Sequence, residues 1–256
     1  MRRELVTSRS NPLAARLRRL NKERAFRRAE GVFCGEGPKL LAEALKWDAR
    51  LETVVCAQGM SLPELPQGVR VVEMPEELLS ALADTKSPQG ILFTCRGREL
   101  ALPQRLPEGC WLVLDGVQDP GNVGTIWRTA DAFGGAGLIL CNGCADPWSP
   151  KVVRSTMGAI FRLPVYEGTV AEAAAAVKRG GVPLCAAALG ENTRDLREAP
   201  LRDCALVIGS EGRGVSEEML ALCDGTVKIP MVERCESLNA AAAAAVALWE
   251  MTGKYL

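Results

Sequence analysis

Three segments of the sequence, 114–134, 207–220 and 228–250, combine glycine with polar side chains that could bind a substrate. Each follows a short apolar run typical of a buried strand, and ligands of open α/β sheets bind in loops beyond the carboxyl ends of strands. In the first segment, Asn122 and Arg128 lie at the start of a predicted helix. An amide and a planar guanidinium there could hold a phosphate or a substrate hydroxyl. The alternative is that Asn122 caps the helix and Arg128 pairs with a surface carboxylate.

The second segment, 207–220, places three glycines around one carboxylate. Gly209, Gly212 and Gly214 indicate that the backbone approaches another group closely. The spacing matches neither G-x-x-x-x-G-K-[ST] nor G-x-G-x-x-G with the right following helix, so a nucleotide-phosphate loop is not favoured. Glu211, which stands between these glycines, is a candidate site residue; the alternative is a tight turn with a solvated glutamate.

The third segment, 228–250, has Pro230 after a predicted strand, and Ser237 and Asn239 close before six consecutive alanines at 240–245. Alanine has the highest helix propensity of all residues, so this run predicts a helix whose small side chains permit close packing. Ser237 and Asn239 are candidate site residues at the start of that helix. Simple capping of the helix is the alternative for both.

The absence of histidine limits the chemistry of this chain, because it excludes Ser-His-Asp triads, histidine bases and histidine-containing metal sites. Of the ten cysteines only Cys141 and Cys144 form a C-x-x-C pair, and no second pair completes a zinc site, so we predict no metal. We expect buried, reduced thiols in a cytoplasmic protein. The other cysteines are scattered singly: Cys34, Cys56, Cys95, Cys110, Cys185, Cys204, Cys223 and Cys235.

The composition is that of an ordinary globular protein. With 256 residues, 48% hydrophobic and 24% charged, the chain is not expected to be mostly disordered or fibrous, and its length favours one or two domains. No apolar run follows the basic N-terminus, so we predict no signal peptide. No run of about 18 apolar residues predicts a membrane span.

Positive charge is concentrated near the start of the chain. Residues 1–30 contain ten Lys or Arg and three Glu, although the net charge of the whole chain is zero. Leu13, Leu17 and Leu20 define an apolar face that predicts one helix over 12–29. The charge asymmetry suggests a polyanionic partner. Contact with nucleic acid is one interpretation of the basic helix, and a merely solvated helix is the other.

Apolar runs alternate with helical patterns along the rest of the chain, which is typical of α/β domains with mostly parallel sheets and helices on both faces. A proline-containing stretch without periodicity predicts a linker at 101–109, between a small α/β domain at 1–100 and a larger domain at 110–256. In the first domain we predict strands at 32–34, 51–56, 69–72 and 90–95 and helices at 38–45 and 76–82. In the second we predict strands at 111–114, 137–141, 182–187, 205–209 and 226–229 and helices at 123–133, 151–157, 171–179, 216–222 and 238–251.

The three glycine-containing segments, taken as a set, match one protein family. N-x-G-x-x-x-R-T-A-D-A-F-G from residue 122, G-S-E-G-x-G-x-S from 209, and I-P-M followed by E-S-L-N resemble the SpoU/TrmH branch of the SPOUT RNA methyltransferases. The intervening segment 145–165 is similar as well. The first half resembles the substrate-binding domain that precedes the catalytic domain in many members, on segments 36–45 and 85–92. The resemblance covers nearly the whole chain.

The resemblance implies a trefoil-knotted methyltransferase domain, preceded by a small α/β substrate-binding domain that binds RNA. It also implies S-adenosylmethionine as cofactor, a 2′-O-methylated ribose as product, and a homodimer through the catalytic domain, with the C-terminal helix in the interface. Carried over residue by residue, the cofactor contacts are Gly209, Ile229 and Leu238, and the catalytic residues are Asn122, Arg128, Glu211, Ser237 and Asn239. The RNA-binding residues that we predict are Arg16, Arg19, Lys22, Lys151 and Arg154.

Two places depart from the family pattern. Glu233 stands where the family commonly has glycine, which affects the expected path of the third segment. Residues 240–243 are all alanine where V-S-V-A is common, and this difference affects the packing of the helix and not the chemistry.

The role of Arg128 has two interpretations. In this family the matching residue is the proposed base, but arginine is normally permanently charged, so Arg128 could instead hold the phosphate beside the target ribose. The separate N-terminal domain with its basic first 30 residues favours a structured RNA, which is recognised largely by shape and phosphates, and we predict that this RNA is ribosomal RNA. The alternatives are a tRNA 2′-O-methyltransferase and an inactive RNA-binding or ribosome-assembly protein of the same fold.

Overall fold

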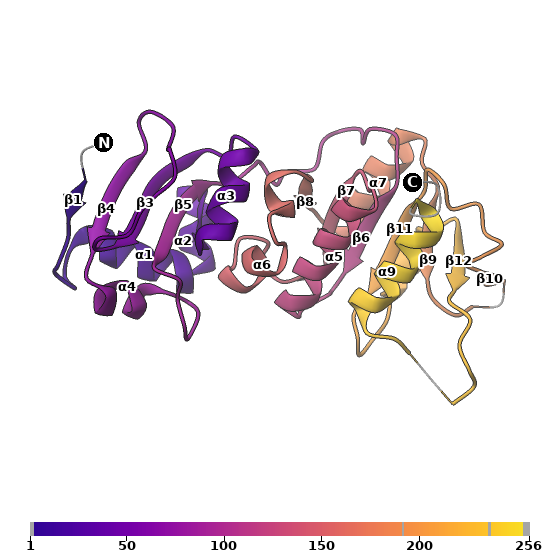
Figure 1. Ribbon diagram of the computed structural model, residues 1–256. Coiled ribbons are helices and arrows are strands. Elements are labelled where there is room, and N and C mark those ends of the chain that lie inside the picture. Colours follow the sequence, from indigo (N-terminus) through magenta and orange to yellow (C-terminus); the bar gives the residue numbers. More distant parts are fainter. Residues whose placement is uncertain (1–2, 191, 235–236, 253–256) are drawn as a thin grey trace. The chain divides into compact units, whose positions relative to one another are not determined.

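The computed structural model of the protein describes residues 3–190, 192–234 and 237–252, and it divides into two compact units (Figure 1). The first unit comprises Met1–Arg98 and Asp146–Phe161. The second unit comprises Glu99–Ala145 and Arg162–Leu256. The segment Asp146–Phe161 therefore folds with the first unit, although its sequence neighbours on both sides belong to the second.

The first unit is built on a five-stranded mixed sheet, in which β2 and β3 run antiparallel to β5 while β1, β4 and β3 are parallel to one another. The four predicted strands are confirmed to within two residues, and a two-residue strand was not predicted. In sheet order the strands are β1 (Glu4–Leu5), β4 (Arg70–Met74), β3 (Leu51–Ala57), β5 (Ile91–Arg96) and β2 (Val32–Glu36). The helices are α1 (Pro12–Lys22), α2 (Arg24–Glu30), α3 (Pro38–Lys46), α4 (Glu76–Leu82), α6 (Pro150–Ser155) and the 3₁₀ helix η1 (Ala159–Phe161).

The prediction of one helix over 12–29 is wrong, because the chain breaks into α1 and α2 at Glu23. This residue has extended backbone angles of φ −107° and ψ 107°. The break allows Arg27 of α2 to turn back and donate a hydrogen bond to the carbonyl oxygen of Leu20, at 2.6 Å. The predicted apolar face is confirmed: its three leucines are buried against α4 and the sheet.

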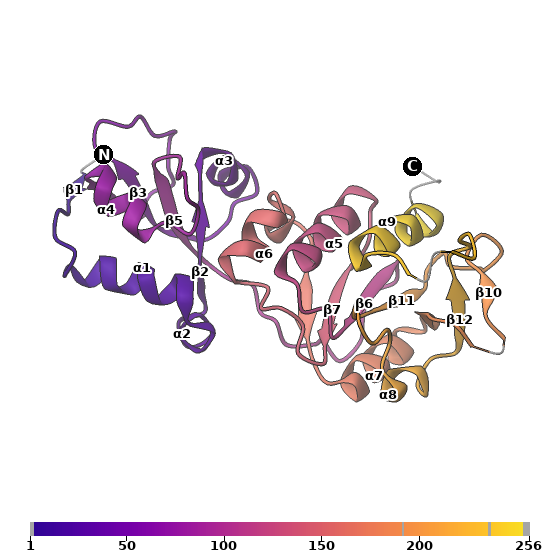
Figure 2. The same cartoon turned by 90° about the horizontal axis from the view of Figure 1, so that it is seen from below.

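The second unit contains a seven-stranded sheet in which every pairing among the described strands is parallel. Figure 2 shows α5 and α9 on one face of this sheet and α7 and α8 on the other, as predicted. In sheet order the strands are β10 (Arg194–Asp195), β12 (Gly225–Lys228), β9 (Leu184–Ala187), β11 (Ala205–Gly209), β6 (Trp111–Asp115), β7 (Gly137–Cys141) and β8 (Val165–Glu167). The helices are α5 (Pro120–Ala132), α7 (Val170–Gly180), α8 (Glu217–Leu220) and α9 (Ala240–Met251).

The central strands are apolar on both faces because helices cover both. All five residues of β6 are buried, as expected for a strand in the middle of a parallel sheet. On the α7 face, Trp111 and Val113 join a core with Val170 and Val177. These observations confirm the α/β fold class, and the trefoil knot stays a prediction. None of the helices in the described part of the chain is long and apolar enough to cross a bilayer.

Candidate active site

Three segments that follow strands of the second unit meet through the side chain of Asn122. Its amide nitrogen donates a hydrogen bond to Glu211 Oε1. Its amide oxygen accepts one from Asn239 Nδ2, at 3.2 Å. Asn122 lies in the first turn of α5, Glu211 follows β11, and Asn239 directly precedes α9. The structure thus brings together one predicted site residue from each of the three glycine-containing segments.

The start of α5 explains why Asn122 is available for this role. Asp119, and not Asn122, is the N-cap of the helix, and its carboxylate accepts the backbone N–H of Asn122 at 2.9 Å. Pro120 occupies the first helical position, where its missing N–H costs nothing. The alternative in which Asn122 merely caps the helix is therefore wrong, because its side chain contacts Glu211 and Asn239 instead.

Asn239 is both a helix cap and a member of the polar cluster, the two roles that the sequence left open for it. Its side-chain oxygen accepts the backbone N–H groups of Ala241 and Ala242 at 2.9 and 3.2 Å, which makes it the N-cap of α9. Its side-chain nitrogen remains available and donates to Asn122. One amide therefore both starts the helix and joins the polar cluster. Ser237 lies two residues earlier and is exposed.

Glu211 projects from a short closed loop. Ser210 and Gly214 exchange two backbone hydrogen bonds of 3.0 and 2.9 Å across it. Gly209 must be glycine here, because a Cβ at this position would lie 2.1 Å from the backbone of Gly214. The close backbone approach inferred from the glycines is thus between two parts of the same loop. Glu211 is exposed and is not merely solvated, since Asn122 donates to it.

A cavity of about 470 Å³ lies beside this loop, which is within the usual size range of small-molecule sites. Its walls include all three predicted cofactor contacts, Gly209, Ile229 and Leu238, as well as Glu211 and Ser237. Small or apolar side chains and glycine backbone form most of the lining. The other lining residues are Ala187, Ala188, Leu189, Ile208, Ser210, Gly212, Gly214, Val227, Lys228, Met231, Ala240 and Ala243.

Arg128 does not contact this cluster. Residues six positions apart on an α-helix are separated by about 9 Å along the axis and point in different directions, which keeps Arg128 away from Asn122. The side chain is exposed on α5. It makes no hydrogen bond or ion pair with any residue that the structure describes, so the predicted alternative of a surface carboxylate partner has no support there.

Motif reasoning did not single out two polar residues next to the cluster, Asp115 and Asn142. Asp115 ends the apolar strand β6, and Asn142 directly follows β7. A carboxylate at the end of a fully apolar strand was the available signal, because a buried charge needs hydrogen-bonding partners.

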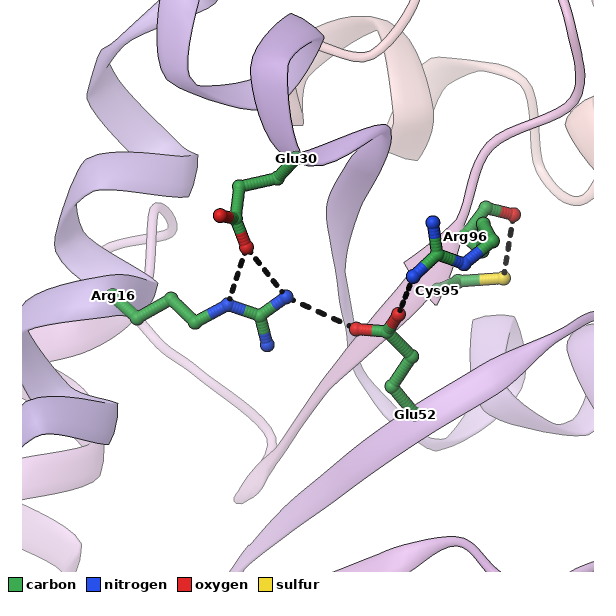
Figure 3. Close-up of polar contacts among 5 residues, drawn as sticks. All are labelled: Arg16, Glu30, Glu52, Cys95 and Arg96. Carbon is green, nitrogen blue, oxygen red and sulfur yellow. Dashed lines mark hydrogen bonds and ion pairs between the residues drawn. The ribbon is translucent and has the colours of Figure 1, made fainter.

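In the first unit, the predicted RNA-binding residues are largely engaged with carboxylates. Figure 3 shows Arg16 between Glu30 and Glu52, at 3.0 Å from each, while Arg96 contacts the other oxygen of Glu52 at 2.8 Å. Burial acts to lower the pKa of Arg16, but hydrogen bonds with Glu52 and Glu30 outweigh it and raise this pKa above its ordinary value. Arg16 therefore joins α1, α2 and β3.

The other predicted RNA contacts differ in their surroundings. Arg19 pairs with Glu23 at 3.1 Å and stacks over the ring of Phe26, and Arg154 pairs with Asp84. Lys151 is exposed on α6, and Lys22 is exposed without an ion-pair partner among the described residues. Exposed pairs contribute only about 0–1 kcal/mol, so a phosphate could displace Glu23 from Arg19. RNA contact by these side chains stays a prediction.

The most buried ion pair of the first unit was not predicted. The guanidinium of Arg27, which is 4% exposed, lies 2.7 Å from the carboxylate of Asp146, and Arg28 contacts the same carboxylate at 3.0 Å. Asp146 also accepts the backbone N–H of Trp148 at 3.2 Å. This cluster attaches the segment Asp146–Phe161 to α2 within the first unit.

Both cysteines of the C-x-x-C pair are buried free thiols. Burial raises the pKa of Cys141 to about 12 and that of Cys144 to about 11. Thiols in this state are poor nucleophiles and poor metal ligands at neutral pH. No group of three or more acidic or cysteine side chains that could hold a metal occurs among the residues described. Cys235, and Arg2, which is one of the ten basic residues counted in 1–30, lie outside the described residues.

Family models, related sequences and solved structures all relate this chain to rRNA methyltransferases. Residues 109–249 match the model of the SpoU rRNA Methylase family, and residues 11–92 match the MRM3-like substrate binding domain. The chain is 34% identical to the Bacillus subtilis 23S rRNA (guanosine(2553)-2'-O)-methyltransferase RlmP, over 87% of this chain and 89% of that protein. It is 29% identical to the mitochondrial rRNA methyltransferase 3 of Homo sapiens, over 90% and 69% of the two chains. The crystal structure of an AdoMet-bound rRNA methyltransferase from Sinorhizobium meliloti is 30% identical, with a TM-score of 0.86 over 97% of each chain.

Proposed function

Because this chain belongs to the SpoU rRNA methylase family, we propose that it methylates the 2′-hydroxyl of a ribose in ribosomal RNA, with S-adenosylmethionine as methyl donor. The observation that carries the proposal is the polar cluster of Asn122, Glu211 and Asn239 beside the cavity of the second unit. These side chains come from three separate segments, and a shared position at one edge of the sheet is what a binding site requires.

The cavity fits S-adenosylmethionine on three grounds. Its volume suits a nucleoside-sized ligand. Ile229 and Leu238 supply apolar walls for a flat base, and Gly209 and Gly212 leave backbone groups within reach of polar atoms. When bound, this cofactor supplies a methyl group that is activated for attack by an oxygen nucleophile.

The residues of the chain position the two reactants and help to remove a proton. Asn122 and Glu211 orient the ribose, while Ser237 and Asn239 hold the third segment and the nucleotide at the cavity. Methyl transfer to the 2′-oxygen releases the proton of the hydroxyl group. Arg128 either takes this proton or, as we favour, holds the adjacent phosphate with its planar fork while solvent takes the proton.

The first unit is suited to binding the RNA. It contains 19 Lys or Arg and 13 Asp or Glu, a net charge of +6, whereas the second unit has 12 and 18, a net charge of −6. We assign residues 1–100 to RNA binding, 101–109 to a linker and 110–256 to methyl transfer, except that the segment Asp146–Phe161 folds with the first unit and joins it in RNA binding. The match of residues 11–92 to a substrate-binding domain supports this assignment. Lys22 and Lys151 are the exposed lysines of the predicted RNA-binding set.

We also propose that the protein is a homodimer through the second unit. On α9, Trp249 is 51% exposed and Val246 is 41% exposed. Trp249 packs edge-on against Phe133, which directly follows α5, with ring centroids 5.8 Å apart. Adjacent apolar side chains that are exposed to solvent are typical of a surface that is buried against another protein chain. The nine described cysteines are all free, which supports a location in the reducing cytoplasm.

Transfer of labelled methyl groups tests the proposed activity. Purified protein and tritiated S-adenosylmethionine are incubated separately with rRNA and tRNA from a strain that lacks the gene. We expect label in rRNA only, as a 2′-O-methyl group at a position that is unmethylated in the deletion strain. The Asn122→Ala variant is the control for contaminating enzymes. Label in tRNA would favour the tRNA alternative, and RNA binding without any transfer would favour the inactive alternative.

A further inference from the structure

Among the described residues of the second unit, Asp115 has the most deeply buried carboxylate, at 2% exposure. It forms no ion pair with any residue that the structure describes. Instead, one oxygen accepts the backbone N–H of Ser216 and the other accepts Asn142 Nδ2, both at 2.6 Å. Burying a charge without a counter-ion is costly unless hydrogen bonds compensate it, so this carboxylate depends on these two donors.

The position of Asp115 explains which segments its carboxylate joins. In the sheet it is paired with Gly209 of β11 on one side and with Cys141 of β7 on the other. Its two partners come from the loops that follow those neighbouring strands. Ser216 ends the loop after β11, and Asn142 begins the loop after β7. The carboxylate therefore connects three consecutive strand ends at the edge of the sheet that carries the cavity.

The loop after β11 is held from both ends. At its start, Gly209 packs against the backbone of Gly214 and Val215. At its end, Ser216 is held by Asp115, and its hydroxyl caps α8 by accepting the N–H of Met219 at 3.3 Å. Asn142 adds a second contact to Ser216, with its Nδ2 3.3 Å from the hydroxyl oxygen.

Glu211 lies in the middle of this loop, and loop backbone forms one wall of the cavity. Asp115 is not among the residues that line the cavity and makes no hydrogen bond to Glu211. Any effect of Asp115 on cofactor or ribose must therefore pass through the loop.

We propose that Asp115 is a positioning residue, which fixes the loop 210–216 so that Glu211 meets Asn122 and the loop backbone forms the cavity wall. This inference rests on the proposed function. The proposal depends on which atoms donate and which accept. The carboxylate of Asp115 accepts from both Ser216 N–H and Asn142 Nδ2, and neither donor has a hydrogen bond to a second carboxylate among the residues described.

Reversal of the donor and acceptor at one contact tests the proposal. Asp115→Asn keeps an acceptor for Ser216 N–H but turns an NH₂ group toward the amide of Asn142. The affinity for S-adenosylmethionine, measured by calorimetry, should then fall about tenfold, as expected for one lost hydrogen bond to a charged group. Adding Asn142→Asp restores a donor and an acceptor at that contact. The double variant should recover an affinity within about threefold of the wild type.

A milder variant keeps the test informative if Asp115→Asn folds poorly. Asn142→Gly removes only the amide donor, and glycine tolerates the φ of +49° at this position. Hydrogen exchange of the loop amides needs no ligand, and it should become faster at Ser216 in both single variants. Asp146→Asn is the matched control, since it alters a buried aspartate of the first unit and should leave cofactor affinity unchanged.

The outcomes separate this proposal from the proposed function. A wild-type protein that neither binds S-adenosylmethionine nor transfers methyl groups contradicts the function, while hydrogen exchange still tests the loop. If wild type is active but Asp115→Asn lowers only the melting temperature, with affinity and Ser216 exchange unchanged, Asp115 has a purely structural role. Failure of the double variant to restore affinity would likewise overturn the proposal.

Discussion

Two buried aspartates show how differently the two units use charge. In the first unit, Asp146 pairs with two cations, Arg27 and Arg28. In the second, Asp115 has no cation partner among the described residues and accepts from a backbone N–H and a neutral amide. Two cations compensate the buried charge of Asp146, whereas Asp115 relies on hydrogen bonds from neutral groups alone, so its carboxylate stays compensated only while the loops that carry those groups keep their positions. The first arrangement suits attachment of a segment, and the second suits a loop that must line a site.

The same contrast extends to the surface side chains. Arg16, Arg19 and Arg154 of the first unit all pair with carboxylates, whereas Arg128 of the second unit makes no hydrogen bond or ion pair within the described chain. The net charge of a unit therefore does not show which of its basic side chains are available to bind a phosphate. Substitutions at the two kinds of arginine should consequently affect different properties, namely stability at the buried pair of Arg27 with Asp146 and methyl transfer at Arg128.

The largest effect should come from Arg27→Ala, which leaves the buried carboxylate of Asp146 with only Arg28. Removing one partner of a buried ion pair costs about 3–5 kcal/mol of unfolding free energy. Urea denaturation followed by circular dichroism measures this loss. Arg19→Ala is the control, because an exposed pair contributes about 0–1 kcal/mol. Similar small losses of unfolding free energy in both variants would show that the buried pair of Arg27 with Asp146 stabilises the protein no more than an exposed pair.

Arg128→Lys should reduce methyl transfer about a hundredfold while stability and cofactor affinity stay close to wild type. Lysine keeps the charge but lacks the planar fork, and a misplacement of about 1 Å can cost this factor. Single-turnover transfer to rRNA across pH measures the effect. Loss at every pH supports a phosphate clamp, whereas retained activity with a profile shifted to lower pH supports a base. Wild-type rates would remove Arg128 from the mechanism.

Asn239 allows its two roles to be separated. Asn239→Ala removes the N-cap of α9 and should lower stability by about 1 kcal/mol, and it also removes the contact with Asn122. Asn239→Ser keeps a capping oxygen but no amide donor, so stability should be retained while transfer falls about tenfold, as expected for one hydrogen bond. Thermal unfolding and transfer rates measure the two properties. Full activity of the serine variant would mean that Asn239 acts only as a cap.

The smallest effect concerns RNA affinity. Lys22→Ala should flatten the dependence of log affinity on log salt concentration by about 0.7–0.9, the contribution of one neutralised phosphate. Arg16→Ala should leave this slope unchanged, because Glu30 and Glu52 already neutralise that side chain. Filter binding to rRNA over a salt series measures both. Deleting residues 1–30 is a poorer test, since it removes buried leucines from the core. Equal salt slopes in the wild type, Lys22→Ala and Arg16→Ala would contradict the proposal that Lys22 contacts a phosphate of the RNA.

Local sequence patterns determined most of the secondary structure. The helix α4 and the strands β7 and β11 have the predicted bounds, because each is a compact apolar pattern with clear turn residues at its ends. The site motifs were also visible, since glycines and caps mark turns through short-range backbone preferences. The break at Glu23 was missed because leucine spacing continues through it and reports only the buried face, while Arg27 turns back to Leu20.

Only the tertiary structure decided which distant residues meet. No local pattern indicates that Asp146 folds with α2 of the first unit. Nor does any local pattern indicate that Asn122 contacts Glu211 and Asn239, which lie 89 and 117 positions further along the sequence. The sequence by itself determined the residue types and the strands that they follow. Packing determined their partners, because parallel pairing places β11 beside β6 and thereby brings the ends of strands that are distant in the chain to one edge of the sheet.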